Sequence, residues 1–263
     1  MIKIHTISDY YLGFNEFTND IDETLPECDL VIVIGNMGTI KRSMIYVEYL
    51  CRKYPEKQFI VSMGRSEDGL HRKNDNEIID GMNNRQLLSE FWPKNLRYEY
   101  NKPIALTIND RKIEVLCFHG FPHVIEETID DSIWKSTQWY KYASHGVTKD
   151  PNEFKHKDAS DVYHGWFPKY STPERCRIDH SIEYEIVKSW VENKSEDTTQ
   201  ILVTAIHPKN DPCMGDIEYT MYPGIKPDVW IASGVKIEDR SDNHILYGNP
   251  GRSESARKAV LVI

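Results

Sequence analysis

The sequence lacks the long apolar runs and the excess of basic residues that mark membrane proteins and nucleic-acid-binding proteins. No stretch reaches the roughly 20 apolar residues that a membrane-spanning helix needs. The chain opens on a short strand-like run instead of an apolar signal segment, so we expect a cytoplasmic protein. Lys and Arg number 32 against 41 Asp and Glu, so the surface as a whole should repel anionic membranes and extended nucleic acid.

Several catalytic and structural motifs are also missing. The turns GNMG and GNPG lack the spacing of a Walker phosphate loop, and GRSED lacks the GxSxG elbow of a nucleophilic serine. The cysteines are widely spaced and form no CxxC pair, which argues against a zinc knuckle or a disulfide framework. We therefore expect reduced thiols at all five positions, Cys28, Cys51, Cys117, Cys176 and Cys213.

Short runs rich in Ile and Val alternate with helical or loop segments, a pattern typical of a buried sheet covered by helices. Asn109 and Asp110 separate two of these runs and predict a hairpin turn. The last two runs are expected to form a closing pair of strands. The predicted strands are Ile2–Ile7, Leu30–Ile34, Phe59–Met63, Ile104–Ile108, Ile113–Phe118, Ile201–Ile206, Val229–Ala232, His244–Tyr247 and Ala259–Ile263.

Two other segments place apolar residues at helical spacing, which predicts amphipathic helices. The first helix has an apolar stripe and an opposite, solvated face; the stripe is Ile40, Met44, Val47 and Cys51, and the face carries Lys41, Arg42 and Glu48. The second helix is expected to follow Asp179, with its stripe at Ile182, Ile186 and Trp190.

Most of the predicted strands run directly into short turns that carry glycine and polar residues. These turns read ISDYYLGF, IGNMGT, SMGRSE, AIHP, ASGVKI and GNPGR. Their order and context resemble the calcineurin-like metallophosphoesterases, whose blocks read DxH, GDxxD, GNHD or GNHE, THHAP, GHTH and NPRGY. The resemblance implies one domain over residues 1–263, a four-layer α/β/β/α sandwich and a bacterial or phage source. In that family two cations activate a water molecule and clamp the phosphoryl oxygens.

The metal ligands implied by this resemblance are mostly replaced. Asp9 matches the first carboxylate, whereas Tyr11 replaces the next His and Asn36 replaces the bridging Asp. The remaining replacements are Arg65 for the Asn ligand, Ser66 for the catalytic His, and Ala205, Gly234 and Lys236 for three His ligands. Ala and Gly offer no side-chain donor, and Arg and Lys repel cations. We therefore expect no dinuclear metal site and no metal cofactor.

The replacements bring positive charge into the expected cleft. Asp9, Arg65 and Lys236 sum to +1 without a metal, and an Arg fork can grip a phosphate. The predicted ligand-binding set is Asp9, Tyr11, Asn36, Arg65, Ser66, His207, Lys236 and Arg252. One alternative is that Arg65 or Lys236 pairs with Asp9 and fills the cavity. Another is that His119 or His207 rebuilds a one-metal site with Asp9.

Residues 134–177 form an aromatic-rich insertion with a charge opposite to that of the chain. Eight Lys or Arg residues stand there against five Asp or Glu residues. Interleaved aromatic and basic residues stack on bases or anchor protein interfaces. The predicted interaction surface is Trp134, Trp139, Tyr142 and Trp166. The alternative is that these aromatics pack on the main sheet.

Taken together, the residues and the resemblance predict a catalytically inactive metallophosphoesterase-like protein that acts by binding. Its partner would be another protein, contacted through the insertion, or a phosphorylated small ligand held in the former active-site cleft. The alternative is an active phosphodiesterase or phosphatase with a rearranged metal site.

Overall fold

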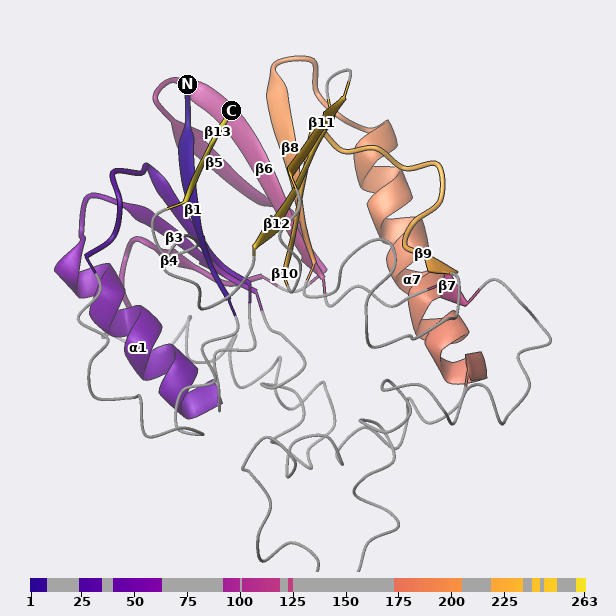
Figure 1. Ribbon diagram of the computed structural model, residues 1–263, viewed down its shortest axis with the longest axis horizontal. Helices are drawn as coiled ribbons and strands as arrows, with labels where there is room; N and C mark the ends of the chain where they lie inside the picture. Colours follow the sequence, from indigo (N-terminus) through magenta and orange to yellow (C-terminus); the bar gives the residue numbers. More distant parts are fainter. Residues whose placement is uncertain are drawn as a thin grey trace, which may run out of the picture.

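The computed structural model describes the strands and two helices of a mixed α/β fold (Figure 1). Two larger sheets and one two-stranded ribbon are present in the described part of the chain. None of the described helices is long and apolar enough to cross a membrane. The described residues are 1–8, 24–34, 40–62, 92–99, 101–118, 123–124, 173–204, 219–233, 238–241, 244–249 and 259–263.

The first sheet has the order β13-β1-β2-β3-β4, and its strands are parallel except for β13. Strand β2 reads as a continuous apolar run because both faces of this sheet are covered. The strand bounds are Lys3–Ile7 for β1, Leu30–Val33 for β2, Gln58–Val61 for β3, Leu96–Arg97 for β4 and Val260–Val262 for β13.

The second sheet has the order β11-β12-β10-β8-β6-β5, with parallel pairing from β12 to β6 and antiparallel pairing at both outer strands. Asn109 and Asp110 both have positive φ, 50° and 61°, so the predicted hairpin turn between β5 and β6 is confirmed. The strand bounds are Ile104–Ile108 for β5, Arg111–Phe118 for β6, Thr198–Thr204 for β8, Val229–Ser233 for β10, Glu238–Ser241 for β11 and His244–Asn249 for β12.

The predicted strands are thus present with small shifts at their ends, but the last two do not pair with each other. β12 lies between β10 and β11 in the second sheet, whereas β13 pairs with β1 in the first. Pairing partners depend on contacts between distant parts of the chain, and the local pattern carries no information about them. A further ribbon joins β7 (His123–Val124) to β9 (Tyr219–Thr220).

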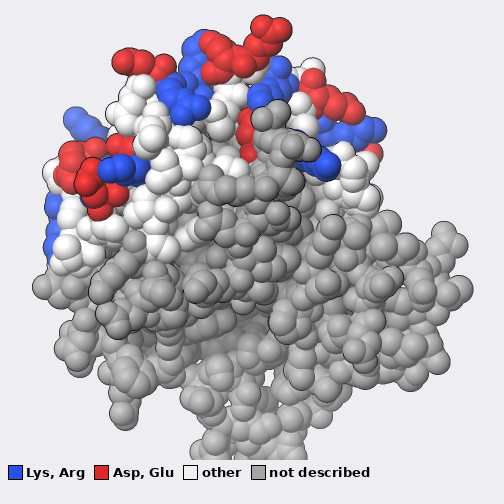
Figure 2. Space-filling view, turned by 45° about the horizontal axis from the view of Figure 1, so that its top comes forward, with Lys and Arg blue, Asp and Glu red and all other residues white. Residues whose placement is uncertain are grey.

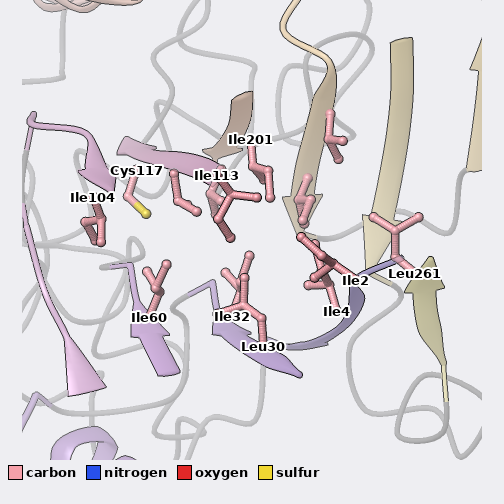
Figure 3. Close-up of a cluster of buried hydrophobic side chains, with 14 of the residues drawn as sticks. Ile2, Ile4, Leu30, Ile32, Ile60, Ile104, Ile113, Cys117, Ile201 and Leu261 are labelled. Carbon is pink, nitrogen blue, oxygen red and sulfur yellow. The ribbon is translucent and has the colours of Figure 1, made fainter. Parts of the chain in front are cut away.

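An apolar core fills the space between the two sheets (Figure 3). Ile4, Ile32 and Ile60 of the first sheet face Ile113 and Ile201 of the second, and all five side chains are almost completely buried. Burying a side chain of this size contributes about 1.5–3 kcal/mol to the transfer free energy. This layer fixes the two sheets relative to each other.

Helix α1 (Ile40–Lys53) covers the outer face of the first sheet. Met44, Val47 and Cys51 of the predicted stripe are buried there against strand residues, so this stripe is confirmed at the positions described. The predicted solvated face is partly wrong. The Glu48 side chain is only 14% exposed, and its Oε2 lies 3.7 Å from Arg52 Nη2.

Helix α7 (Pro173–Glu192) lies against the second sheet. Its predicted stripe is confirmed at Trp190 and wrong at Ile182. Ile182 is 55% exposed, whereas His180, Glu183, Val187 and Trp190 are buried. The helix turns a polar stripe inward because the sheet and the segment before β10 supply hydrogen-bonding partners for it. The helix also begins earlier than predicted, so residues 173–177 belong to it and not to an insertion.

Candidate functional site

The parallel strands of both sheets end at the same side of the molecule, which we call the carboxyl edge. Contacts at the opposite side, the amino edge, show this alignment: Asn109 Nδ2 lies 3.4 Å from Met1 O, and Arg111 Nη1 lies 3.0 Å from Ile263 O. The start of β6 therefore lies beside the start of β1. At the carboxyl edge Ser62, just after β3, lies close to Cys117 of β6. In Figure 1 the amino edge lies at the top.

Four described residues at the carboxyl edge have neutral, buried side chains: Ser8, Ser62, Cys117 and Thr204. Ser8 is fully buried, and its Oγ has no hydrogen-bond partner among the described residues. Thr204 is also fully buried, and its Oγ1 accepts a hydrogen bond from Trp230 Nε1 at 3.0 Å. Burial raises the pKa of the Cys117 thiol to about 12, so this group is protonated and inert at neutral pH. These residues form a layer of uncharged, buried side chains at the carboxyl ends of the strands.

The amino edge carries mixed charges instead. Lys3 pairs with Glu27, Lys112 pairs with Asp197, and Lys194 pairs with Asp228. Figure 2, in which the top of Figure 1 is turned forward, shows basic and acidic side chains interleaved over the described surface. Exposed pairs of this kind add little to the stability of a fold. No excess of one sign gathers on this described surface, so nothing there favours a charged ligand.

The residues of the predicted cleft all follow strands that end at the carboxyl edge, but they lie outside the described residues. Asp9 and Tyr11 follow β1, Asn36 follows β2, Arg65 and Ser66 follow β3, His207 follows β8, Lys236 follows β10, and Arg252 follows β12. The alternative ligand His119 follows β6 and is likewise outside them. The structure therefore aligns the strands that lead to the cleft, and the side chains of the cleft remain a prediction.

The predicted interaction surface, Trp134, Trp139, Tyr142 and Trp166, also lies outside the described residues. Among the described residues, no three His, Cys, Asp or Glu side chains are grouped so that they would hold a metal ion. Cys28, Cys51 and Cys117 are buried and form no disulfide, which confirms the predicted reduced state for these three thiols.

Sequence reasoning missed a buried polar and aromatic cluster between α7 and the second sheet. Tyr222 Oη donates a hydrogen bond of 2.7 Å to Glu183 Oε2, and the Tyr222 ring stacks on both His180 and Trp230. The fifth member is Thr204, which Trp230 contacts. The spacing of His180, Glu183, Val187 and Trp190 places them on one helix face. This face was missed because an apolar stripe is sought among apolar residues only, and His180 and Glu183 are polar.

A solved protein structure is similar to this fold, although comparison of sequences finds no match. No protein-family model matches the chain, and no curated protein matches it. A phosphopantetheinyl hydrolase from Mycobacterium tuberculosis is similar in structure, with a TM-score of 0.57 and 12% identity over 94% of this chain and 88% of that one. A dimetal phosphatase from Danio rerio has a TM-score of 0.40 and 8% identity over 95% and 87%.

The first of these similarities shows the fold alone, because the sequence identity is too low to carry over an activity. It supports a metallophosphoesterase-like α/β fold with two parallel-rich sheets. The second is too distant to add to this conclusion.

Proposed function

We propose that this chain is a metallophosphoesterase-like protein without a two-metal centre, and that it binds a phosphorylated small ligand at the carboxyl edge. One observation supports this most strongly: the strands of both sheets end together there, and their last described side chains form a neutral, buried layer. The charge of the edge is then set by the residues that follow the strands. In open α/β sheets, ligands bind outside the carboxyl ends of the parallel strands.

The proposal includes one domain over residues 1–263 with the layers in the order α/β/β/α. Three contacts support this order. Helix α1 packs on the outer face of the first sheet, the apolar core joins the two sheets, and Trp190 of α7 hydrogen-bonds to Glu114 of β6 in the second sheet. The role of residues 134–172 in this domain is left to experiment.

The donor chemistry after the strands argues against a pair of divalent cations. Asp9 is the one carboxylate that matches the metallophosphoesterase blocks, and Ala205 and Gly234 bring no side-chain donor. Divalent cations in such sites need several carboxylate oxygens or imidazole nitrogens at about 2.0–2.6 Å. The described strand ends add hydroxyl groups and a protonated thiol, which are poorer ligands for a divalent cation than carboxylates or imidazoles. We therefore assign no catalytic step to a metal.

The same positions suit an anion. Arg65 and Lys236 follow β3 and β10, and with Asp9 they give a net charge of +1. A guanidinium binds two phosphate oxygens through its planar fork, and an ammonium adds a point charge. Both residues replace metal ligands of the family pattern, so each would lie beside the position of a cation in an active enzyme. The positive charge is retained while the activated water is lost.

Binding is tested by thermal unfolding and calorimetry with inorganic phosphate and 5′-AMP as probes. Wild-type protein should be stabilised, by about 2.7 kcal/mol at a ligand concentration 100 times Kd. The double variant Arg65→Ala with Lys236→Ala should lose this effect. Its matched control is Lys3→Ala with Lys112→Ala, which removes two positive charges from the amino edge and should leave binding intact.

Other outcomes would assign a different function. Hydrolysis of bis(p-nitrophenyl) phosphate with added Mn²⁺, abolished by Asp9→Ala, would show an active enzyme with a rearranged metal site. If neither probe binds and a co-purifying protein is lost in Trp139→Ala or Trp166→Ala, the chain is a scaffold that acts through its aromatic segment. Either result would overturn the ligand-binding proposal.

A further inference from the structure

Strand β5 is an outer strand of the second sheet, and β6 is its one partner in the described part of the chain (Figure 1). Its residues Ala105 and Thr107 are exposed, and Leu106 between them is half-buried. A free strand edge presents unpaired N–H and C=O groups, which are a template for pairing with another chain. The open side of β5 is thus available to a further strand.

The hairpin turn shows which backbone groups of β5 point away from β6. Its two residues, 109–110, both have positive φ, so the turn closes on a hydrogen-bonded pair, Ile108 with Arg111. Hydrogen-bonded and non-hydrogen-bonded pairs alternate along an antiparallel ladder. The backbone groups of every second residue counted back from Ile108 therefore face β6. Those of Ala105 and Thr107, which lie between these residues, face outward.

The residues of β5 permit pairing, and the residue before the strand limits how far pairing can extend. The strand reads IALTI and contains neither a charge nor a proline, whereas many exposed edge strands are protected by such residues. Pro103 directly precedes the strand and has no N–H to donate. A partner strand is therefore restricted to the short stretch around Ala105 and Thr107.

A second copy of the chain fits this edge in one antiparallel register. With a twofold axis at Leu106, Ala105 of each copy lies opposite Thr107 of the other, and each of these two pairs exchanges two hydrogen bonds. An axis at Ala105 would place Thr107 opposite Pro103, which lacks a donor. An axis at Thr107 would place Ala105 opposite the hairpin turn. The register centred on Leu106 therefore satisfies the outward groups of both residues.

The charges at the two ends of β5 favour the same register. Lys102 stands two residues before the strand and Asp110 two residues after it; both are exposed, and neither is ion-paired with a described residue. An axis at Leu106 brings the positive end of each copy beside the negative end of the other, and opposite charges across paired strands are stabilising. The other charge at the turn, Arg111, contacts the first sheet, where its Nη1 donates to Ile263 O at 3.0 Å.

We propose that the open edge of β5 is a self-association surface: two copies of the chain pair through it in antiparallel orientation and continue the second sheet across a dimer. At the axis the two half-buried Leu106 side chains cover each other. The carboxyl edges of the two copies then point in opposite directions. This association does not depend on the ligand proposed above, so phosphate binding and dimerisation succeed or fail independently.

The contact between the two copies is small. One short strand from each copy covers less than the roughly 800 Å² per partner of a standard interface, so we expect a weak dimer with a Kd on the order of 100 µM. Sedimentation velocity at protein concentrations of about 5–500 µM covers this range. Wild-type protein should shift from monomer to dimer over the series. A wild-type protein that stays monomeric throughout overturns the proposal.

A matched pair of variants at Thr107 tests the backbone pairing. Thr107→Pro removes an outward N–H and no hydrogen bond to β6, and proline is tolerated on an edge strand at such a position. The dimer loses two hydrogen bonds, one from each copy, so its Kd should rise about tenfold or more. Thr107→Val keeps the N–H and the β-branched shape and should change Kd by less than about twofold. Equal Kd values for the two variants would overturn pairing through this edge.

Cysteine cross-linking tests the register. In a non-hydrogen-bonded antiparallel pair the two Cα atoms are about 4.5 Å apart, within the roughly 4.4–6.8 Å that a disulfide spans. Leu106→Cys should therefore give a covalent dimer under mild oxidation, above the background of wild-type protein. The matched control is Ala105→Cys, in which the two substituted positions lie about 8 Å apart, too far for a disulfide. Position 105 is the more exposed, so cross-linking there at or above the level of Leu106→Cys would indicate random collision and overturn the register.

A charge swap decides the proposal even if Thr107→Pro disturbs the hairpin. Lys102→Glu places two negative ends together and Asp110→Lys places two positive ends together, so each variant alone should dimerise about threefold more weakly than wild type, or weaker still. A mixture of the two variants again places opposite charges together at both ends. Sedimentation of the mixture, with one variant fluorescently labelled, should recover the wild-type Kd. A mixture that associates as weakly as the separate variants would overturn the proposed pairing.

Discussion

The two helices cover their sheets by different physical means. Helix α1 buries Met44, Val47, Leu50 and Cys51, all apolar, against the first sheet. Helix α7 buries Val187 and Trp190 together with His180 and Glu183 against the second sheet and the turn before β10. The first interface depends on non-directional apolar transfer, whereas the second also depends on hydrogen bonds with fixed geometry. Of the two, the α7 interface is the one with directional contacts.

The largest expected effect is a cavity in the α1 interface. Leu50 is fully buried in the cluster beneath α1. Leu50→Ala should lower the free energy of unfolding by about 2–5 kcal/mol, because transferred apolar surface and packing are both lost. Urea unfolding followed by circular dichroism measures this. A loss below about 1 kcal/mol would show that α1 is not packed as described.

A smaller effect is expected from one hydrogen bond in the α7 interface. Tyr222→Phe leaves the Glu183 carboxylate without the donor that lies 2.7 Å away. The free energy of unfolding should fall by about 1–3 kcal/mol, the usual cost of an unsatisfied buried polar group. The same urea titration measures the change. If Tyr222→Phe leaves the free energy of unfolding unchanged, the hydrogen bond does not stabilise the α7 interface. The proposed difference between the α1 and α7 interfaces would then be wrong.

The α1 interface should also be sensitive to alkaline pH. Burial, followed by the charge of Glu48, raises the pKa of the Cys51 thiol from 9.0 to about 12. The unfolded chain ionises at this group above pH 9 while the folded chain stays protonated, so stability is full below pH 9 and is lost as the pH rises towards 12. At pH 10 the loss should be about 1.4 kcal/mol. Cys51→Ala should unfold with a flatter pH profile, and identical profiles would contradict the assignment.

The smallest effects are expected on the outward faces of the same helices. Ile45 of α1 and Ile182 of α7 are each 55% exposed. Ile45→Lys and Ile182→Lys should both change the free energy of unfolding by no more than about 0.5 kcal/mol. Thermal unfolding of the two variants provides the check. A large fall in the free energy of unfolding in Ile182→Lys alone would show that Ile182 lies on the buried face of α7, as the apolar spacing predicts.

The difference between the helices also explains which parts of the fold the sequence predicts. The strands and the stripe of α1 follow from apolar periodicity, which reflects local burial. The face of α7 was mispredicted because Ile182 and Ile186 repeat at helical spacing while the true stripe includes His180 and Glu183. Both side chains are buried because they contact Tyr222, which is distant in sequence. Tyr222 has a positive φ, which no local sequence pattern predicts.

The site is predictable to a lesser degree than the fold. The predicted strands before the cleft residues are present, since β1, β2, β3, β8, β10 and β12 precede those residues in the sequence, but the positions of the cleft residues themselves stay a prediction. That both sheets end at one edge depends on long-range contacts, such as that between Arg111 and Ile263, and no periodicity contains them. The buried contacts of Tyr222 with Glu183, His180 and Trp230 were missed for the same reason.

Calorimetric titration of the protein with inorganic phosphate in the presence of EDTA tests the central claim most directly. The account predicts binding that needs no divalent cation and that disappears when Arg65 and Lys236 are both changed to Ala. Phosphate binding that requires Mn²⁺ or Zn²⁺ and is lost in Asp9→Ala would contradict it.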